Sequence, residues 1–240
     1  MLLQLLNMDK FIRDQGLMEV KSYKMPFKSY DEDGLWSEII FGPIGSKTRS
    51  EKFGWIDLKH KFIHPIVYNM LSTVSPETSR IIKEKNRYIV QDEQYIEHIE
   101  GETGIDFLIN SFDKVNFEKI AHKHKTETAK YLQKNKNLIL IDKFLVMPAA
   151  NRDIDIYNKK GKLEVEEINN LYTKLLIYIQ QLTGVDEIDS ITNKKIQLQL
   201  NAIISYIKKM KMTGKKGLFR GTMLRKSLDY STRLVLTNDP

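Results

Sequence analysis

Two regular apolar stripes in residues 164–211 constrain the fold of this chain more than any other feature. In the first stripe the apolar residues are spaced 3, 4, 3 and 4 apart: Ile168, Leu171, Leu175, Tyr178 and Leu182. In the second they are spaced 4, 3, 4 and 3 apart: Ile196, Leu200, Ile203, Ile207 and Met210. Heptad-like spacing places each set on one face of an α-helix, so we expect two amphipathic helices.

The segment between the stripes predicts a reversal of the chain. Gly184 is a helix-stop residue, and three polar residues after it are candidate helix caps: Ser190, Thr192 and Asn193. A short connection between two helices favours an antiparallel hairpin. At a rise of about 1.5 Å per residue, an arm of about 20 residues is about 30 Å long.

The first helix carries more apolar surface than one stripe needs, because Tyr172, Leu176, Ile177 and Ile179 lie beside it. Two interpretations stay open. The hairpin packs flat on its own domain, or it protrudes and its second apolar face docks another protein. In the second interpretation the candidate partner-binding residues are Tyr172, Ile177 and Tyr178.

The remaining sequence predicts an α+β fold, rich in helices, with small sheets. A strand within "FGWIDLKHKFIHPIVYNML" should run into a helix near Pro65. We expect short strands around 36–41, helices near 77–86, 104–112 and 116–134, one or two buried strands within 137–148, and a polar loop after them. The polar loop is expected at 150–162, with a turn at Gly161.

The net charge of +7 is confined to one end of the chain. Residues 208–240 contain nine Lys and Arg and two acids, whereas residues 1–207 contain 29 of each sign. A charged run is commonly a solvated tail, but Leu218, Phe219 and Tyr230 interleave with these charges. Because disordered tails carry few large apolar groups, we favour a folded element that faces a polyanion.

No catalytic or metal-binding constellation stands out. The chain has no Cys, which excludes disulfides and thiolate zinc sites. The pairs His60/His64 and His122/His124 lack a further ligand in the spacing of a zinc motif, so we expect no metal site. "GPIGSKT" at 42–48 departs from the spacing of a phosphate-binding loop. No apolar run approaches the roughly 20 residues of a membrane span.

The basic end carries a resemblance to a known family. "GKKGLFRGTMLRKSLDYSTRLVLTNDP" (214–240) resembles the switch region of the beta-prime subunit of multisubunit DNA-directed RNA polymerases. The family pattern is G-K-x-G-R-F-R-x-N-L-L-G-K-R-V-D-Y-S-x-R-S-V, followed by a Gly-Pro. The residues that match are Gly214, Lys215, Gly217, Phe219, Arg220, Leu224, Lys226, Asp229, Tyr230, Ser231, Arg233 and Pro240.

Further segments agree with that family in the same order. "DGLWSEIIFGP" (33–43) is similar to D-G-L-F-x-x-x-I-F-G-P, and "FGWIDLKHKFIHPIVY" (53–68) is similar to the segment that follows it in the family. "LILIDKFLVMPAANR" (138–152) resembles the family's strand, turn and lid, and "EINNLYTKLL" (167–176) resembles the start of its clamp hairpin. The resemblance is weakest over 70–135.

The resemblance implies a role in transcription. The family's segments build the clamp, which closes over the DNA cleft and the RNA–DNA hybrid. The implied domains are a clamp core at 1–163 with a lid loop at about 148–162, a clamp helical hairpin at 164–211 and a switch segment at 212–240 that leads towards the catalytic barrel. The implied nucleic-acid-binding residues are Lys215, Lys216, Arg220, Lys226 and Arg233, with Lys216 chosen for its charge alone.

Several departures from the family narrow this expectation. Only residues 44–52 stand where bacterial relatives have a four-cysteine zinc ribbon, and only residues 208–213 stand where they have a rudder loop. The first hairpin arm lacks the Arg and Asn residues that receive sigma factors, so we expect a different promoter-specificity factor. These reductions resemble the polymerases of giant phages, which implies a virus-encoded protein in the cytoplasm of an infected cell.

The given sequence ends before the family's N-A-D-F-D-G-D loop, whose aspartates bind catalytic magnesium. We therefore expect magnesium on another segment or chain, no cofactor in this one, and enzyme activity only as part of a polymerase complex. The expected partners are template DNA, the RNA–DNA hybrid, other polymerase subunits and the specificity factor, with no membrane. Two alternatives stay open: a non-enzymatic nucleic-acid-binding module with clamp-like architecture, and a scaffold protein.

Overall fold

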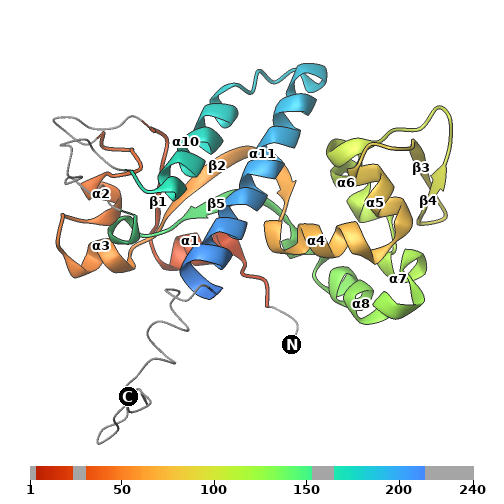
Figure 1. Cartoon of the computed structure of the whole chain (residues 1–240), viewed down its shortest axis with the longest axis horizontal. Helices are drawn as coiled ribbons and strands as arrows, with labels where there is room; N and C mark the ends of the chain where they lie inside the picture. Colours follow the sequence, from red (N-terminus) through yellow and green to blue (C-terminus); the bar gives the residue numbers. More distant parts are fainter. Residues whose placement is uncertain (1–3, 24–30, 153–164, 214–240) are drawn as a thin grey trace, which may run out of the picture. The chain divides into compact units, whose positions relative to one another are not determined.

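A computed structural model describes residues 4–23, 31–152 and 165–213 of the chain. The described residues form mostly helices together with a three-stranded and a two-stranded sheet, which confirms the predicted α+β class (Figure 1). The chain divides into two compact units, Met1–Ile203 and Ile204–Pro240. In the second unit the described residues continue α11 and then form a π-helical segment, Ile207–Thr213.

The three-stranded sheet has the strand order β1-β2-β5. Strand β1 (Met18–Glu19) is parallel to β2 (Gly54–Ile63), and β2 is antiparallel to β5 (Leu140–Val146). The pairing of β2 with β5 shifts between Asp57 and Phe62, where Lys59 has a positive φ of 61°. The strands expected within 53–63 and 137–148 are thus confirmed.

Helix α1 (Met8–Asp14) lies against β5, and Lys143 of that strand forms an ion pair with Asp9. The strand expected around 36–41 is wrong, because residues Glu38–Phe41 form helix α2. Ser37 explains the difference: its hydroxyl oxygen accepts hydrogen bonds from the amides of Ile39 and Ile40, at 3.1 and 3.2 Å. A side-chain N-cap of this kind stabilises the first turn of a helix. Helix α3 (Lys47–Glu51) follows.

Strand β2 passes directly into helix α4 (Pro65–Val74), as the sequence predicted. Pro65 occupies the first turn, where the missing N–H costs nothing, and His64 is the N-cap. The Nδ1 atom of His64 accepts a hydrogen bond from the amide of Ile66 at 3.3 Å. Helix α5 (Pro76–Ile82) begins in the same way, with Ser75 as its N-cap.

The region between α5 and β5 holds a two-stranded sheet and a set of short helices. The strands are β3 (Tyr88–Gln91) and β4 (Gln94–Glu97), and the helices are α6 (Gly104–Ser111), η1 (Phe112–Lys114), α7 (Phe117–Ile120), η2 (Lys123–Lys125), α8 (Thr126–Lys134) and α9 (Lys136–Ile139). The helix predicted near 104–112 is present, the one predicted near 116–134 is divided into α7, η2 and α8, and the β3–β4 hairpin was not predicted.

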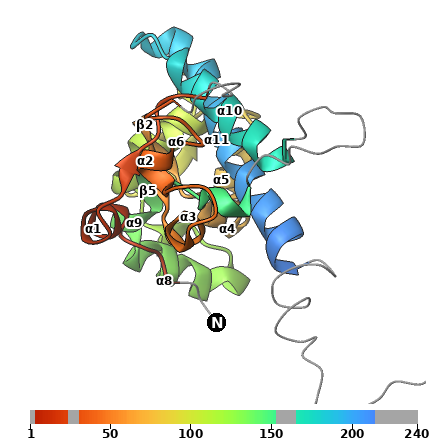
Figure 2. The same cartoon turned by 90° about the vertical axis from the view of Figure 1, so that its left-hand side faces the viewer.

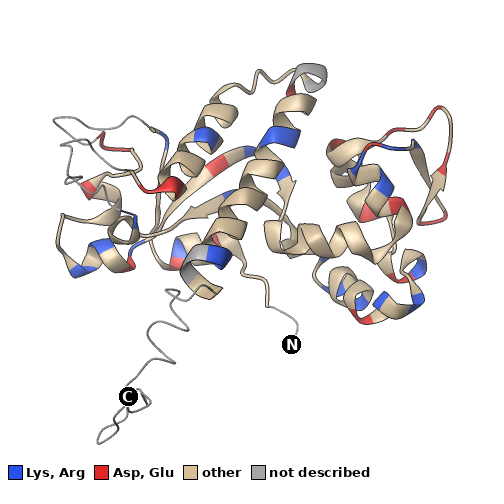
Figure 3. Cartoon of the chain, in the orientation of Figure 1, with Lys and Arg blue, Asp and Glu red and all other residues tan. Residues whose placement is uncertain are grey.

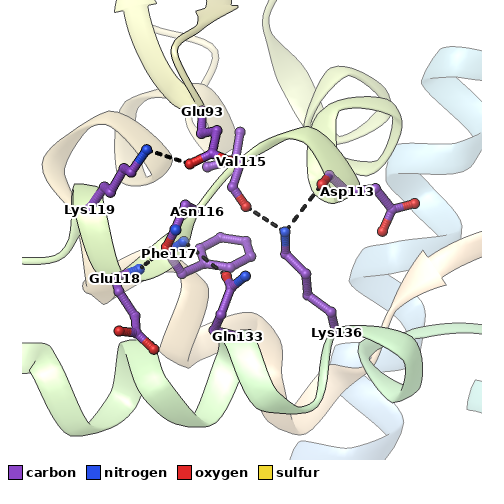
Figure 4. Close-up of polar contacts among 9 residues, drawn as sticks. All are labelled: Glu93, Asp113, Val115, Asn116, Phe117, Glu118, Lys119, Gln133 and Lys136. Carbon is purple, nitrogen blue, oxygen red and sulfur yellow. Dashed lines mark hydrogen bonds and ion pairs between the residues drawn. The ribbon is translucent and has the colours of Figure 1, made fainter.

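The β3–β4 hairpin escaped prediction because its turn has an unusual sequence. Asp92 and Glu93 both have positive φ values, 51° and 64°, which a two-residue hairpin turn requires. Asn-Gly or Asp-Gly is the usual sequence signal for such a turn, and the Asp-Glu dipeptide found here is not one. The ion pair between Glu93 and Lys119 ties this turn to α7 (Figure 4).

A buried cluster joins these helices to the end of β2, and includes Ile63, Val67, Leu108, Phe112 and Ile139. Figure 4 shows the polar contacts at its edge. Lys136 donates to the carbonyl oxygens of Val115 and Asp113, at 2.5 and 3.2 Å, and the side chain of Gln133 accepts from the amide of Phe117 at 3.2 Å. These contacts satisfy backbone groups in the link between η1 and α7.

The predicted helical hairpin is present as α10 (Glu167–Gln180) and α11 (Asp186–Tyr206). The two helices lie beside each other in both views (Figure 1, Figure 2). The side-chain amide of Gln199 joins them by donating to the carbonyl oxygen of Leu171 at 2.9 Å. Helix α10 also lies against β2.

Candidate functional site

The basic residues expected to bind nucleic acid lie outside the described residues: Lys215, Lys216, Arg220, Lys226 and Arg233. Over the described elements Lys and Arg are interspersed with Asp and Glu (Figure 3). This agrees with the equal numbers of acidic and basic residues in 1–207. The candidate site that the structure describes is therefore the root and body of the α10–α11 hairpin.

A buried arginine lies at the root of the hairpin. Arg152 follows the short helix η3 (Ala149–Asn151) and is only 1% exposed. Its guanidinium donates to the carbonyl oxygens of Leu35 (2.6 Å) and Met147 (3.0 Å) and to the Oδ1 atom of Asn169 (2.9 Å). The planar, five-donor guanidinium suits such a divergent set of acceptors.

Aromatic rings and a return hydrogen bond complete this root cluster, which we define as Arg152, Asn169, Tyr172, Leu35 and Phe41. The Cζ atom of Arg152 lies 4.8 Å from the ring centroid of Phe41 and 5.7 Å from that of Tyr172, so both rings contribute cation–π attraction. The Nδ2 atom of Asn169 donates back to the carbonyl oxygen of Arg152 at 2.6 Å.

A second buried arginine braces the segment 33–43 from α3. Arg49, also 1% exposed, donates to the carbonyl oxygens of Gly42 (2.9 Å) and Trp36 (3.4 Å). Gly42 ends α2 with a φ of 96°, a conformation that favours glycine. Arg49 and Arg152 thus hold the same segment from two sides.

The sequence did not predict these arginine roles. Arg152 and Asn169 belong to segments that carry the family resemblance, but no function is predicted for either. The only local signal was a charged residue directly after a buried strand and its turn, in "LILIDKFLVMPAANR". That pattern is more typical of a solvated loop, because Arg is seldom fully buried.

The three predicted partner-binding residues differ in their exposure to solvent. Tyr172 is fully buried, and its hydroxyl accepts a hydrogen bond from the amide of Met147 at 3.3 Å. Burial raises the pKa of Tyr172, while the nearby charge of Arg152 opposes that rise. Tyr172 is therefore a core residue, and the expectation that it contacts a partner is wrong. Ile177 and Tyr178 are partly exposed on α10.

The buried face of α10 consists of Ile168, Asn169, Tyr172, Leu175, Leu176 and Ile179. Of the surplus apolar residues in the sequence, Tyr172, Leu176 and Ile179 are thus directed inward. This favours the interpretation that this side of the hairpin packs on its own domain. The surface available to a partner is correspondingly smaller, and Ile177 and Tyr178 are what remains of the predicted set.

Helix α11 contacts the sheet through a glutamine. Gln197 is fully buried, and its side-chain amide bonds both backbone groups of Ile63: Oε1 accepts from the N–H at 2.9 Å, and Nε2 donates to the carbonyl at 2.8 Å. The side chain thereby takes the place of a neighbouring strand at the end of β2. Ile196, Leu200 and Ile203 of the predicted stripe are buried around it.

The hairpin tip is held by Asp189, which was not among the predicted helix caps. Asp189 accepts hydrogen bonds from the amide and hydroxyl of Thr183 (2.9 and 3.0 Å) and from the amide of Gly184 (2.8 Å). The hydrogen bond that the backbone amide of Thr183 donates is the main cause that lowers the pKa of Asp189. Because α11 begins at Asp186, the capping roles expected of Ser190, Thr192 and Asn193 are wrong.

A groove of about 580 Å³ lies beside the hairpin. It is lined by His60 and Lys61 of β2, Asp106 and Asn110 of α6, and Ser190 and Asn193 of α11. The Nδ2 atom of Asn193 donates to Asp106 at 3.1 Å, and Lys194 forms an ion pair with Glu84 at 2.8 Å. These two contacts join α11 to α6 and to the end of α5.

Neither metal-binding clusters nor membrane-spanning helices occur in the described parts of the chain. Within residues 4–23, 31–152 and 165–213, no three His, Asp or Glu residues come together as a metal site. In the same ranges no helix combines the length and apolar character needed to cross a membrane.

Comparison with known proteins leaves the family open. No protein-family model matches the sequence, and the search of curated proteins finds no similar one. The class that the fold and the site define is thus an α+β protein whose helical hairpin is anchored at a buried arginine.

Proposed function

We propose that this chain forms the clamp of a virus-encoded, multisubunit DNA-directed RNA polymerase of the giant-phage type, as the N-terminal part of its beta-prime subunit. One observation supports this most. Three of the segments that resemble the family, 33–43, 138–152 and 167–176, converge on Arg152. In this proposal the contacts of Arg152 hold together parts of the clamp that the resemblance assigns to three separate segments.

In this proposal the hairpin and the switch segment have different tasks. The helices α10 and α11 provide a firmly anchored arm, and Ile177 and Tyr178 belong to the face that docks a promoter-specificity factor. Lys215, Lys216, Arg220, Lys226 and Arg233 contact the phosphates of the template strand and of the RNA–DNA hybrid. Phosphate contacts of this kind fix position without reading sequence.

In this proposal the assembled polymerase complex, and not this chain alone, carries out the chemical step. Nucleotidyl transfer needs magnesium held by carboxylates, and the clamp contributes by keeping the nucleic acid in register with that centre. The charge distribution favours this division of tasks. Residues 1–207 are neutral overall, so the attraction for nucleic acid is concentrated in residues 208–240.

The alternative is a non-enzymatic module that binds nucleic acid, or a scaffold protein that uses the same architecture. It shares the basic end with the first proposal but needs no polymerase partners. Purification of the tagged chain from infected cells, with identification of the co-purifying chains, separates the two. Polymerase subunits among them support the clamp, and their absence supports the alternative.

The direct test is scaffold binding by the assembled complex over a salt series, with Arg220→Ala and Arg233→Ala compared with the wild type. Each lost phosphate contact should weaken binding to every template sequence alike. It should also flatten the slope of log affinity against log salt by about 0.9 for a duplex contact or about 0.7 for a single-strand contact.

The matched control is Lys83→Ala, which removes one positive charge from an exposed position near the end of α5. Its affinity and salt slope should equal those of the wild type. If the two arginine variants behave like this control, the basic end does not hold nucleic acid, and the clamp proposal fails.

A further inference from the structure

Arg152, directly after η3, and Asn169, in the first turn of α10, are joined by two hydrogen bonds of opposite direction. Arg152 donates from Nη1 to Asn169 Oδ1 at 2.9 Å, and Asn169 donates from Nδ2 to the carbonyl oxygen of Arg152 at 2.6 Å. Both residues are essentially buried, at 1% and 0% exposure. A reciprocal pair of this kind fixes the relative direction of the two backbones, since rotation of either one breaks a bond.

The same guanidinium extends this fixation to a third segment. Its Nη2 atom donates to the carbonyl oxygen of Leu35 at 2.6 Å, and its Cζ atom lies 4.8 Å from the ring centroid of Phe41. One helical turn after Asn169, the hydroxyl of Tyr172 accepts from the amide of Met147. The first turn of α10 is therefore held by polar contacts to the end of β5 and, through Arg152, to the segment 33–43.

Only the guanidinium can serve this geometry. It donates to acceptors on three separate segments, at residues 35, 147 and 169, and a planar fork reaches all of them at once. A lysine ammonium carries the same charge on a flexible stem, but it is a point donor and cannot reproduce the planar fork that reaches these acceptors.

We propose that Arg152 is a positioning residue for the hairpin: it sets the direction in which α10 leaves the domain, and thereby where Ile177 and Tyr178 are presented. The partner-docking part of this inference rests on the proposed function, whereas the positioning of α10 does not. Arg152 touches neither partner nor nucleic acid, and it acts through Asn169 and the first turn of α10.

The chain supplies a matched control in Arg49. It is equally buried, and it also holds carbonyl groups of the segment 33–43, at Trp36 and Gly42. Both of these carbonyl groups belong to the segment 33–43 and not to α10. Comparison of Arg152→Lys with Arg49→Lys therefore separates positioning of the hairpin from general stabilisation of the segment 33–43.

The first measurement is hydrogen exchange of the full-length chain, followed by mass spectrometry. Arg152→Lys should raise exchange of the amides in residues 167–174 by about tenfold, since a lost charged hydrogen bond shifts local opening by at least that factor. Arg49→Lys should leave the exchange rates of these amides within about twofold of the wild-type rates. Equal exchange of residues 167–174 in the two variants overturns the positioning role, whatever the function of the protein.

The second measurement is capture of the hairpin-docking chain by the assembled complex. Arg152→Lys should weaken capture by about tenfold, while Arg49→Lys keeps it, because only the first variant displaces α10. Faster exchange with undiminished capture overturns the link between position and docking. If Arg152→Lys speeds exchange but even the wild-type complex captures no partner, the positioning of α10 is supported and the proposed function fails.

If Arg152→Lys does not fold, Asn169→Ala takes its place. That variant removes the reciprocal pair and leaves the bonds from Arg152 to Leu35 and Met147. It should give the same increase in exchange over residues 170–174, and wild-type exchange in that range overturns the proposal.

Discussion

Replacing Gln197 by leucine tests how α11 is attached to the sheet. In the structure the side chain of Gln197 bonds both backbone groups of Ile63, and all of these atoms are buried. Leucine has nearly the same size but can neither donate nor accept. The N–H and C=O of Ile63 would then remain buried without partners, because β5 pairs with the opposite edge of β2.

The magnitude follows from the two orphaned groups. A buried polar group left without a partner costs about 1–3 kcal/mol, and the added apolar burial of leucine offsets roughly 1 kcal/mol. We therefore expect the free energy of unfolding to fall by about 1–5 kcal/mol. With a urea m-value of about 2 kcal/mol/M, the midpoint should move down by about 0.5–2.5 M.

The assay is urea unfolding followed by circular dichroism, with Gln199→Leu as the matched control. Gln199 also lies on α11 and is 9% exposed, but it makes a single bond, to the carbonyl of Leu171. Its loss should cost about 1 kcal/mol. If Gln197→Leu shifts the midpoint no further than Gln199→Leu, the side chain of Gln197 does not complete the end of β2, and the reasoning is refuted.

Two further predictions concern pH and docking. Burial lowers the pKa of His64 below its ordinary value of 6.5, so the unfolded chain binds a proton more readily than the folded one. The stability due to neutral His64 should be complete above pH 6.5 and decline as the pH falls further, as urea midpoints over a pH series will show. His64→Asn keeps an N-cap without the titration, so it should flatten this decline, and an unchanged decline would contradict the assignment. For docking, Ile177→Asp with Tyr178→Asp should abolish promoter-specific initiation and spare elongation on a preformed scaffold, because charge opposes apolar contact. The control is Asn69→Asp with Thr73→Asp, which adds the same charge at two exposed positions on α4. If the Ile177/Tyr178 variant keeps both activities, the hairpin is only a packing element.

The sequence by itself determined the elements whose signals are local. The alternation of apolar residues and Pro65 placed β2 and the start of α4, and the heptad-like stripes with Gly184 placed α10 and α11. These signals depend on residues within a few positions of each other. The same reasoning failed for α2, where the cap at Ser37 outweighed the apolar run, and for the turn at Asp92.

The tertiary structure alone decided which faces are buried and which polar residues hold them. The periodicity of α10 could not tell whether Tyr172 faces a partner or the core, because both arrangements use the same spacing. Gln197 meets Ile63 across 134 positions, and Arg152 meets Leu35 across 117. No local pattern marks such contacts, since a glutamine or an arginine in a sequence is ordinarily solvated. They exist because folding brings distant backbone groups together in the absence of water, where an unpaired carbonyl or amide costs more than burying the side chain that bonds it.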